Sequence, residues 1–317
     1  MSLLLTPDYP ELEYRRRADE EKKACPWGQR KLCIVELLFL TRYWNKETVP
    51  SPIMVYAGAA PGKHIYFLAN CFPAFTFHLY DPAEFQIVST QRVICHREFF
   101  TDDTAKLWSG RSDIFFVSDV RMSNYETRTP LENEKNIWEE MEAQRRWAEI
   151  ISPISSLLKF RLPYAGFNLP FVKEGKVEYL DGDVYFQPWS PQTTTETRLV
   201  PNGKVKNWDI KKYESQLFHH NVVVRESQNF PHKVIDTSRE ILNDYDSFFE
   251  VTTIEEYLAK TGRRMSILEM SQELTRSLNE GKKKETQLTL SLIRQDVKVM
   301  KKRYNKKEEK SEKIEEE

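Results

Sequence analysis

Short apolar runs that end in glycine or an acid recur in the first half of the chain. Residues 53–57 lead into a glycine loop, residues 75–80 end at Asp81, and residues 114–118 end at Asp119. Apolar runs of this length, bounded by turn residues, are typical of buried strands. They predict the central strands of a sheet whose carboxyl ends carry polar residues.

Helical patterns alternate with these runs. Residues 31–40 read as a mostly buried helix, a second helix runs through Leu68, and residues 132–151 form a third. Alternation of strand and helix favours a mostly parallel α/β sheet. Asp181-Gly182, between apolar residues 177–180 and 184–186, predicts a hairpin and an antiparallel edge. Further strands are expected at residues 86–95, 157–162 and 194–200.

The ends of the chain are more polar. Residues 11–23 predict a charged helix, residues 238–306 predict several helices, and from residue 301 the chain is almost wholly Lys and Glu. Such a tail is typical of disorder or of a frayed helix. We therefore expect an N-terminal extension (1–26), a central domain (27–230), a helical C-terminal extension (231–300) and a disordered tail (301–317).

The composition is rich enough in hydrophobic residues for a packed core, and the chain as a whole is not strongly basic. Hydrophobic residues make up 40% of the 317 residues, and the net charge is −1. No apolar run approaches a membrane span, and the N-terminus is not expected to be a signal peptide. Cys25, Cys33, Cys71 and Cys95 form no CxxC pair, which favours reduced thiols and a cytosolic protein. The scattered histidines show no metal-ligand spacing, so no metal is expected.

The loop Gly58-Ala59-Ala60-Pro61-Gly62, between a strand and a helix, indicates a nucleotide-like cofactor. Asp81, at the end of the next strand, lies at the spacing of an acid that binds a ribose hydroxyl. Dinucleotide sites normally show GxGxxG, whose glycines cradle a pyrophosphate. The loop lacks the third glycine, and S-adenosylmethionine has no phosphate to cradle, so the motif favours S-adenosylmethionine over NAD.

Lys31, Asp119, Lys159 and Glu196 are the candidate catalytic residues. Lys159 stands inside an apolar strand, where desolvation and a second lysine lower its pKa while carboxylates raise it. A neutral lysine is able to take the proton of a ribose 2′-OH, and the other three residues would orient it. This set therefore suits methyl transfer to a hydroxyl.

Several sequence blocks, in this order, resemble the poxvirus cap-specific mRNA 2′-O-methyltransferases, a family that also serves as the small stimulatory subunit of poly(A) polymerase. The blocks are residues 28–31, 55–64, 118–121, 156–161, 187–191 and 196–199. The resemblance covers roughly residues 14–225 and implies a Rossmann-like methyltransferase domain at 27–230. It implies that Lys31, Asp119, Lys159 and Glu196 form a catalytic tetrad in which Lys159 activates the 2′-OH. The implied cofactor residues are Gln29, Tyr56, Gly58, Ala60, Pro61, Gly62, His64, Asp81, Asp119, Val120 and Arg121.

The resemblance also implies a site for the methylated guanine of an mRNA cap. Tyr14 and Tyr164 would hold the base between their rings, and Glu214 would read its edge. Arg161 and Arg198 would contact the RNA. Two departures stand out: Gly166 replaces a second guanine-reading acid, and Asp81-Pro82-Ala83 lacks the arginine that usually follows the cofactor acid.

The expected reaction is methylation of the first transcribed nucleotide of capped mRNA. A viral poly(A) polymerase catalytic subunit is a possible partner, and the expected location is the cytoplasm of an infected cell or the virion. Three alternatives stay open. They are a 2′-O-methyltransferase of structured RNA, a non-enzymatic stimulatory subunit of a polyadenylation complex, and an NAD-dependent oxidoreductase, which the missing glycine disfavours.

Overall fold

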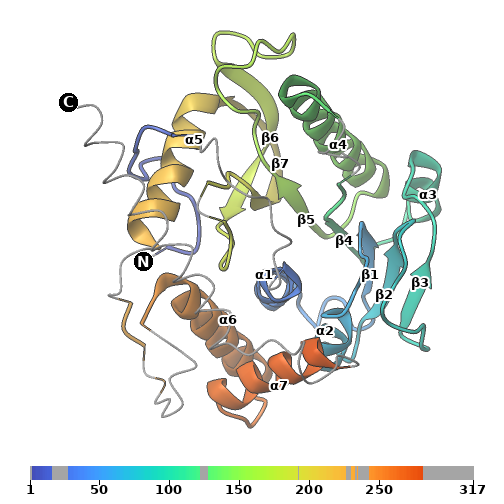
Figure 1. Cartoon of the computed structure of the whole chain (residues 1–317). Helices are drawn as coiled ribbons and strands as arrows, with labels where there is room; N and C mark the ends of the chain where they lie inside the picture. The colour runs from blue at the N-terminus through green and yellow to red at the C-terminus, as the bar shows by residue number, and fades with distance from the viewer. Residues whose placement is uncertain are drawn as a thin grey trace.

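A mixed sheet forms the centre of the computed structural model, which describes residues 2–15, 28–121, 128–191, 193–225, 230–232, 234 and 243–280. In this part of the chain the sheet has 7 strands, in the order β3-β2-β1-β4-β5-β7-β6 (Figure 1). The first five strands along the chain pair in parallel, and β7 pairs antiparallel with β5 and β6. This confirms the predicted α/β sheet with an antiparallel edge. The strands are β1 (Ile53–Ala57), β2 (Thr76–Tyr80), β3 (Val93–His96), β4 (Ile114–Ser118), β5 (Ser155–Phe160), β6 (Lys176–Tyr185) and β7 (Thr197–Asp209).

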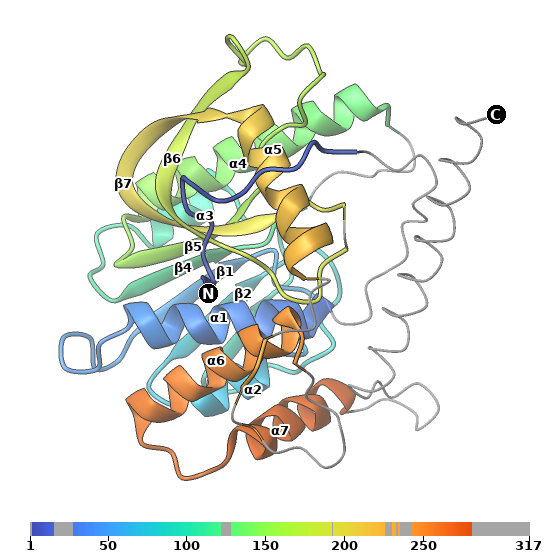
Figure 2. The same ribbon diagram turned by 90° about the vertical axis from the view of Figure 1, so that its left-hand side faces the viewer.

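Helices cover both faces of the parallel strands (Figures 1 and 2). On one face lie α1 (Gly28–Tyr43), α2 (Ile65–Cys71), α6 (Tyr245–Thr261) and α7 (Ile267–Asn279). On the other lie α3 (Asp102–Leu107) and α4 (Pro130–Ile151). Strands such as β1 and β4 are buried from both sides, which is why they are almost wholly apolar. Beside β7, α5 (Ile210–His219) continues into the short π-helix η1 (His220–Val224).

The first helix, α1, lies between the sheet and α6, and its middle is buried on all sides. Arg30 is 2% exposed and forms a double contact with Glu250 of α6, at 2.9 Å from Nε to Oε2 and 2.5 Å from Nη2 to Oε1. Ser271 of α7 accepts a further hydrogen bond from Arg30 at 3.0 Å. A buried charge of this kind is stable only when it is paired and hydrogen-bonded. The pair therefore fixes the start of α1, where Lys31 lies, against the C-terminal helices.

Capping residues set the ends of the helices. Thr129 and Glu132 form a capping box at the start of α4, with Pro130 at the first turn. Ser266 and Glu269 do the same for α7. Gly262 ends α6 in the left-handed region, at φ 68°. Residues at or next to these helix ends therefore determine where the helices begin or end.

The predicted hairpin at Asp181-Gly182 is wrong. Residues 176–185 form the single strand β6, with a register shift between Leu180 and Gly182. A Cβ atom at Gly182 would lie 2.1 Å from the carbonyl oxygen of Val200. The glycine is therefore required by the close approach of β7 at an irregular point of the ladder, and no chain reversal occurs there.

Other predicted elements differ in length. The strand expected at 86–95 is only β3, Val93–His96, because residues 86–92 form a loop. The strand expected at 194–200 begins at Thr197 and continues to Asp209. Three described helices, α3, α5 and the short π-helix η1, were not predicted. The helix at 31–40, the helix through Leu68 and the helix at 132–151 are confirmed as α1, α2 and α4.

The N-terminal residues run along the edge of the sheet and then along α5. Leu5 donates its backbone N–H to Val184 in β6, and Leu12 donates to Ser215 in α5. Residues 11–15 are not helical, and residues 16–23 of that predicted helix lie outside the described residues. So do the tail at 301–317 and the predicted helical stretch 281–306. The division of the chain at residues 26, 230 and 300 stays a prediction. Among the described helices, none has the length and apolar character needed to cross a bilayer.

Candidate active site

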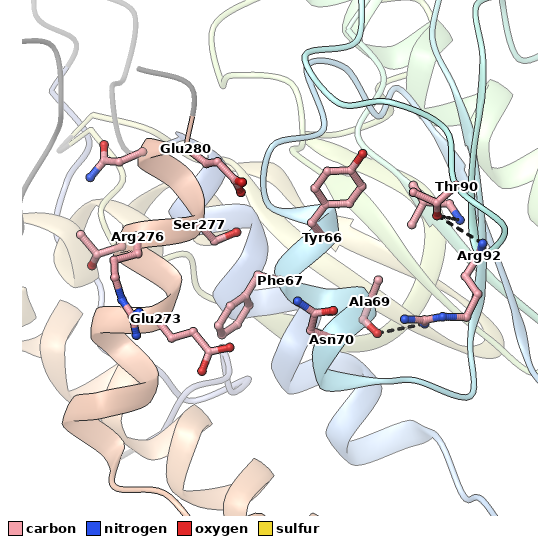
Figure 3. Close-up of a pocket in the computed structure, with 13 residues that line it drawn as sticks. Tyr66, Phe67, Ala69, Asn70, Thr90, Arg92, Glu273, Arg276, Ser277 and Glu280 are labelled. Carbon is pink, nitrogen blue, oxygen red and sulfur yellow. Dashed lines mark hydrogen bonds between the residues drawn. The ribbon is translucent and has the colours of Figure 1, made fainter. Parts of the chain in front are cut away.

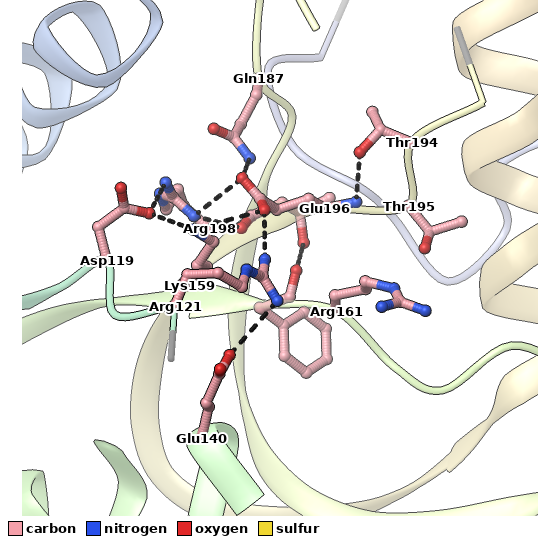
Figure 4. Close-up of polar contacts among 12 residues, drawn as sticks. Asp119, Arg121, Glu140, Lys159, Arg161, Gln187, Thr194, Thr195, Glu196 and Arg198 are labelled. Atoms are coloured by element: carbon pink, nitrogen blue, oxygen red, sulfur yellow. Dashed lines mark hydrogen bonds and ion pairs between the residues drawn. The ribbon is translucent and has the colours of Figure 1, made fainter. Parts of the chain in front are cut away.

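The predicted catalytic residues meet at the carboxyl ends of the central strands. Figure 4 shows three of them, Asp119, Lys159 and Glu196. Lys159 lies on β5 directly opposite Arg198 on β7, and Asp119 follows β4. The ammonium Nζ of Lys159 lies 2.8 Å from Oδ1 of Asp119. The guanidinium of Arg198 contacts the same oxygen at 2.6 Å. One carboxylate oxygen thus holds two cations from neighbouring strands.

Glu196, just before β7, completes the cluster. Its carboxylate lies 3.6 Å from Nζ of Lys159 and 3.3 Å from Nζ of Lys31 on α1. Arg121 approaches at 2.7 Å, and Arg198 at 3.5 Å. The structure therefore brings Lys31, Asp119, Lys159 and Glu196, hereafter the tetrad, into one network.

The tetrad is partly open to solvent, and its charged groups contact one another. The Lys159 side chain is 14% exposed and that of Arg198 is 3% exposed. Burial lowers the pKa of Lys159 below its ordinary value, although Asp119 and Glu196 oppose the shift. Burial alone would raise the pKa of Glu196, but Lys159 and Lys31 outweigh it and hold the pKa well below its usual range. The site therefore contains ionised carboxylates beside a lysine that loses its proton more readily than usual.

The glycine loop lies beside this cluster. Gly58 has φ 80°, and a Cβ there would lie 2.7 Å from the backbone nitrogen of Val120. Glycine is therefore required both by the backbone conformation and by the close approach of the segment after β4. Asp81 accepts the backbone N–H of Ala60 at 3.0 Å, which ties the loop to the end of β2.

Two predicted cofactor residues, Tyr56 and His64, are fully buried beneath the loop. Tyr56 donates its hydroxyl to Glu36 at 2.7 Å, and Nε2 of His64 lies 2.9 Å from the other oxygen of that carboxylate. Nδ1 of His64 lies 2.9 Å from Oε1 of Gln29. Glu36 thus joins Tyr56 and His64, which flank the loop in the sequence, and their direct contact with a cofactor stays a prediction. Sequence reasoning missed Glu36, although a lone acid within the apolar run 32–40 was the available signal.

The predicted cap-binding rings lie together, although their sequence positions are far apart. The ring centroids of Tyr14 and Tyr164 are 5.2 Å apart, with an interplanar angle of 33°. Both hydroxyls donate to the carbonyl oxygen of Thr193, at 3.1 and 3.3 Å. A base between two rings needs about 7 Å between them, twice the usual contact distance. The rings are therefore in direct contact here and have to separate to admit a base.

Acidic residues surround this ring pair. Glu214, on α5, is 6% exposed, and burial raises its pKa to about 7. Glu134 of α4 binds the Arg161 guanidinium at 2.5 Å and accepts the backbone N–H of Tyr164 at 3.1 Å. The Arg161 guanidinium lies 4.3 Å from the centre of the Tyr164 ring. Sequence reasoning missed Glu134, which carries no motif signal in a charged helix.

Arg161 and Arg198, predicted to contact RNA, are both buried and paired within the protein. Their contact with RNA stays a prediction. Gly166 lies near Tyr164 with φ 99°, and no atom within 4 Å would meet a Cβ there. The surroundings of Gly166 therefore leave room for a side chain, whereas its left-handed backbone favours glycine.

A cavity of about 960 Å³ lies away from the tetrad, between α2 and α7 (Figure 3). Its walls mix aromatic, amide and oppositely charged side chains, among them Tyr66, Asn70, Arg92, Glu273 and Arg276. None of the predicted site residues lines it. The tetrad and the ring pair therefore lie outside this cavity.

No group of three or more His, Cys, Asp or Glu side chains placed to hold a metal ion occurs in the described part of the chain. Cys33, Cys71 and Cys95 are free thiols, and Cys25 lies outside the described residues. Burial raises the pKa of Cys33 well above its ordinary value, which makes that thiol unreactive.

Comparisons with known proteins agree with this geometry. A family model described as poly A polymerase regulatory subunit matches residues 8–280. The chain belongs to this family. A relative from Myxoma virus (strain Lausanne), named cap-specific mRNA (nucleoside-2′-O-)-methyltransferase, is 24% identical over 295 residues, covering 84% of this chain and 82% of the relative. A Fowlpox virus (strain NVSL) protein of the same name is 26% identical over 225 residues, 62% of this chain and 68% of its own. The resemblance identified from the sequence is thereby confirmed.

Proposed function

We propose that this chain transfers a methyl group from S-adenosylmethionine to the 2′-OH of the first transcribed nucleotide of capped mRNA. The observation that carries the proposal is the position of Lys159, within 2.8 Å of Asp119 and 3.6 Å of Glu196, at the strand ends of a Rossmann-like sheet. The names of the viral relatives support the same substrate. The reaction would take place in the cytoplasm of an infected cell or in the virion.

The residues around the glycine loop fit a nucleoside cofactor. The backbone after β4 approaches Gly58 so closely that no side chain fits between them, which places the glycine loop next to Asp119. Asp81 retains acceptor capacity for a ribose hydroxyl, because each carboxylate oxygen carries two lone pairs and receives one backbone N–H. S-adenosylmethionine supplies an electrophilic methyl group when bound. The neutral lining of Ala60 and Pro61 suits a cofactor without phosphates.

The tetrad would handle the proton of the 2′-OH. Lys159 in its neutral form accepts this proton and becomes an ammonium. Asp119 and Glu196 stabilise the ammonium and fix its direction, while burial keeps the pKa of Lys159 below its ordinary value. Lys31 adds positive charge at Oε1 of Glu196, the carboxylate oxygen other than the one nearest Lys159. Lys159 thus alternates between a neutral amine, which burial favours, and an ammonium, which the two carboxylates stabilise.

The ring pair and Glu214 would select the cap. A methylated guanine carries a positive charge, which favours stacking between Tyr14 and Tyr164. The nearby carboxylate of Glu214 would accept hydrogen bonds from the guanine edge. The same pair would contribute nothing to a structured RNA without a cap, which separates this proposal from that alternative.

A methyl-transfer assay on RNA with an N7-methylated cap, an unmethylated cap or no cap tests the proposal. We expect wild type to methylate the N7-methylated substrate, and Lys159→Ala to lose about 100- to 10,000-fold in rate, the usual contribution of a general base. Lys106→Ala removes an exposed lysine far from the tetrad and serves as the control. Equal rates for wild type and Lys159→Ala would refute the mechanism, and equal rates with and without a cap would refute the substrate.

A second function follows from the description of the family model. We propose that the chain also stimulates a viral poly(A) polymerase catalytic subunit, independently of methyl transfer. Lys159→Ala is expected to stimulate RNA tailing as well as wild type does. If neither wild type nor Lys159→Ala changed the rate of RNA tailing, the proposed stimulatory function would be refuted.

A further inference from the structure

The residues that precede β7 connect the ring pair to the tetrad. We call residues 193–197 the bridging segment. Thr193 accepts the hydroxyls of Tyr14 and Tyr164, and Glu196, three residues later, contacts Lys159 and Lys31. Figure 4 shows Thr194, Thr195 and Glu196 on this one stretch of chain. The position of the bridging segment therefore sets the geometry of both parts of the site.

One buried side chain holds the bridging segment on both sides of Glu196. The hydroxyl of Tyr213, on α5, donates to the carbonyl oxygen of Thr195 at 2.6 Å and lies 3.0 Å from Oγ1 of Thr197. Tyr213 is 3% exposed. Burial raises its pKa far above the ordinary value, so the hydroxyl keeps its proton and stays a donor.

The hydroxyls of Tyr213 and Thr197 have fewer protons than contacts. Thr197 and Tyr213 have one hydroxyl proton each, while three contacts connect them to Thr195, to each other and to the carbonyl oxygen of Phe160. The shortest contact, from Tyr213 to Thr195, takes the tyrosine proton. The hydroxyl of Thr197 then donates either to the carbonyl oxygen of Phe160 or to the hydroxyl oxygen of Tyr213. Without the Tyr213 hydroxyl, the Thr195 carbonyl loses its donor, and the segment loses an anchor beside Glu196.

Tyr213 also contacts the strand that carries Lys159. Its ring packs edge-on against Phe160, the residue after Lys159, with centroids 5.4 Å apart. The next residue along α5 is Glu214, the acid of the ring-pair site. One turn of α5 therefore supports the strand of Lys159, the segment of Glu196 and the acid beside the rings.

We propose that Tyr213 is a positioning residue for methyl transfer, whose hydroxyl holds the Glu196 carboxylate against Lys159. This proposal rests on the proposed function of the tetrad. The hydroxyl of Tyr213 contacts Thr195 and Thr197, so its effect on Glu196 passes through these two residues. Removal of the hydroxyl alone is expected to change the rate of the chemical step and leave binding intact.

Tyr213→Phe tests the inference, because it keeps the ring and removes only the hydroxyl. The matched control is Tyr257→Phe, which removes an equally buried tyrosine hydroxyl that donates to the carbonyl oxygen of Cys71 at 2.8 Å, on the opposite side of the protein. For Tyr213→Phe we expect kcat to fall about 10- to 100-fold, the usual effect of a small misplacement of a catalytic group. The KM for capped RNA should change by less than about twofold, as expected for an interaction that matters mainly in the transition state. Tyr257→Phe should retain the wild-type kcat.

The pH dependence separates positioning from a general loss of stability. Glu196 raises the pKa of Lys159, so moving Glu196 away lowers that pKa. The rise of kcat with pH should therefore occur at lower pH in Tyr213→Phe than in wild type. Labelling of Lys159 by a small amine-reactive reagent at a series of pH values, read by mass spectrometry, should show the same shift without any turnover.

Each outcome decides the inference. A lower kcat with a shifted profile and unchanged KM supports it. An unchanged kcat and labelling profile, or an equal loss in Tyr257→Phe, overturns it. A raised KM with unchanged kcat and pH profile also overturns it, since Tyr213 would then serve binding alone. If wild type methylates no capped RNA, the proposed function fails, and the Lys159 labelling profile still decides whether Tyr213 sets the environment of that lysine.

Discussion

Lys159 and Arg198 face each other across β5 and β7, and both contact Oδ1 of Asp119. Arg198 is always charged, whereas Lys159 is able to lose its proton. When Lys159 is neutral, Arg198 still compensates the charge of Asp119. The carboxylate therefore stays ionised in both states of the lysine, and its pKa is held below the usual value by Lys159 and Arg198 against the effect of burial.

Asp119→Asn should nearly abolish methyl transfer. The amide keeps the shape but removes the charge that stabilises the Lys159 ammonium, and we expect a loss of about 100- to 10,000-fold in kcat. Because Asp119 raises the pKa of Lys159, the remaining activity should rise at lower pH than in wild type. A pH series of single-turnover rates measures both effects. Asp103→Asn, which breaks an exposed pair with Lys106, is the control; a wild-type pH profile in Asp119→Asn would contradict the assigned role.

Cap binding should depend on pH through Glu214. Its pKa is raised to about 7 by burial, so the carboxyl is protonated below that pH and accepts fewer hydrogen bonds from a guanine edge. The affinity for an N7-methylated cap analogue should therefore increase as the pH rises from about 5.5 to about 7. Fluorescence titration measures this. Glu214→Gln should bind more weakly and show a flat profile over the same range, and an equally steep profile in that variant would assign the titration to another group.

Cap affinity should also depend on the aromatic ring of Tyr164. Tyr164→Ala removes one face of the base site and should weaken cap binding by about 1–3 kcal/mol, the usual value for stacking of a base on an aromatic ring. Tyr164→Phe keeps the ring and loses only the hydroxyl bond to Thr193, so its affinity should stay near wild type. Competition with cap analogue in a binding assay compares the two. The binding of uncapped RNA should be the same in all three proteins; a loss there as well would show that the ring serves RNA in general.

The glycine loop offers a controlled pair of substitutions. Gly58 and Gly110 have almost the same φ, 80° and 73°, but only at Gly58 would a Cβ meet backbone atoms of Val120. Both Gly→Ala variants carry a cost of about 1–3 kcal/mol for a left-handed backbone. Only Gly58→Ala should also lose S-adenosylmethionine binding, measured by calorimetry beside the unfolding temperature. If Gly58→Ala bound S-adenosylmethionine with wild-type affinity, the glycine loop would not be part of the cofactor site.

The sequence predicted the elements whose signals are local. The buried strands at 53–57 and 114–118 are apolar throughout, and each ends at a turn residue, so both were predicted with their observed bounds. The tetrad was predicted from residue type and from the family blocks. That Asp119 and Lys159 meet follows from the parallel order of β4 and β5, because carboxyl ends of parallel strands lie at one edge. Glu196, which precedes the antiparallel strand β7, and Lys31, on α1, reach them only through the folding of the whole domain.

Features that depend on distant contacts were missed or misread. Gly182 has the sequence of a turn, yet the approach of Val200 requires it inside a strand. Glu134 carries no motif, because its role comes from Arg161, which reaches it only in the folded chain. Glu36 stands out as a lone acid in an apolar run, but its partner Tyr56 is likewise brought to it only by folding. Tyr213 gave no signal for the same reason.

The buried pair of Arg30 and Glu250 limits how this protein is able to vary. Arg30 precedes Lys31, so any change at Glu250 is transmitted to a tetrad residue through one peptide bond. A chain shortened before α6 would remove the groups on α6 and α7 that hydrogen-bond Arg30 and would expose to water the apolar face of α1 that α6 covers. The C-terminal helices therefore cannot be inherited, exchanged or lost as an independent module, and changes in them should be matched by changes in α1.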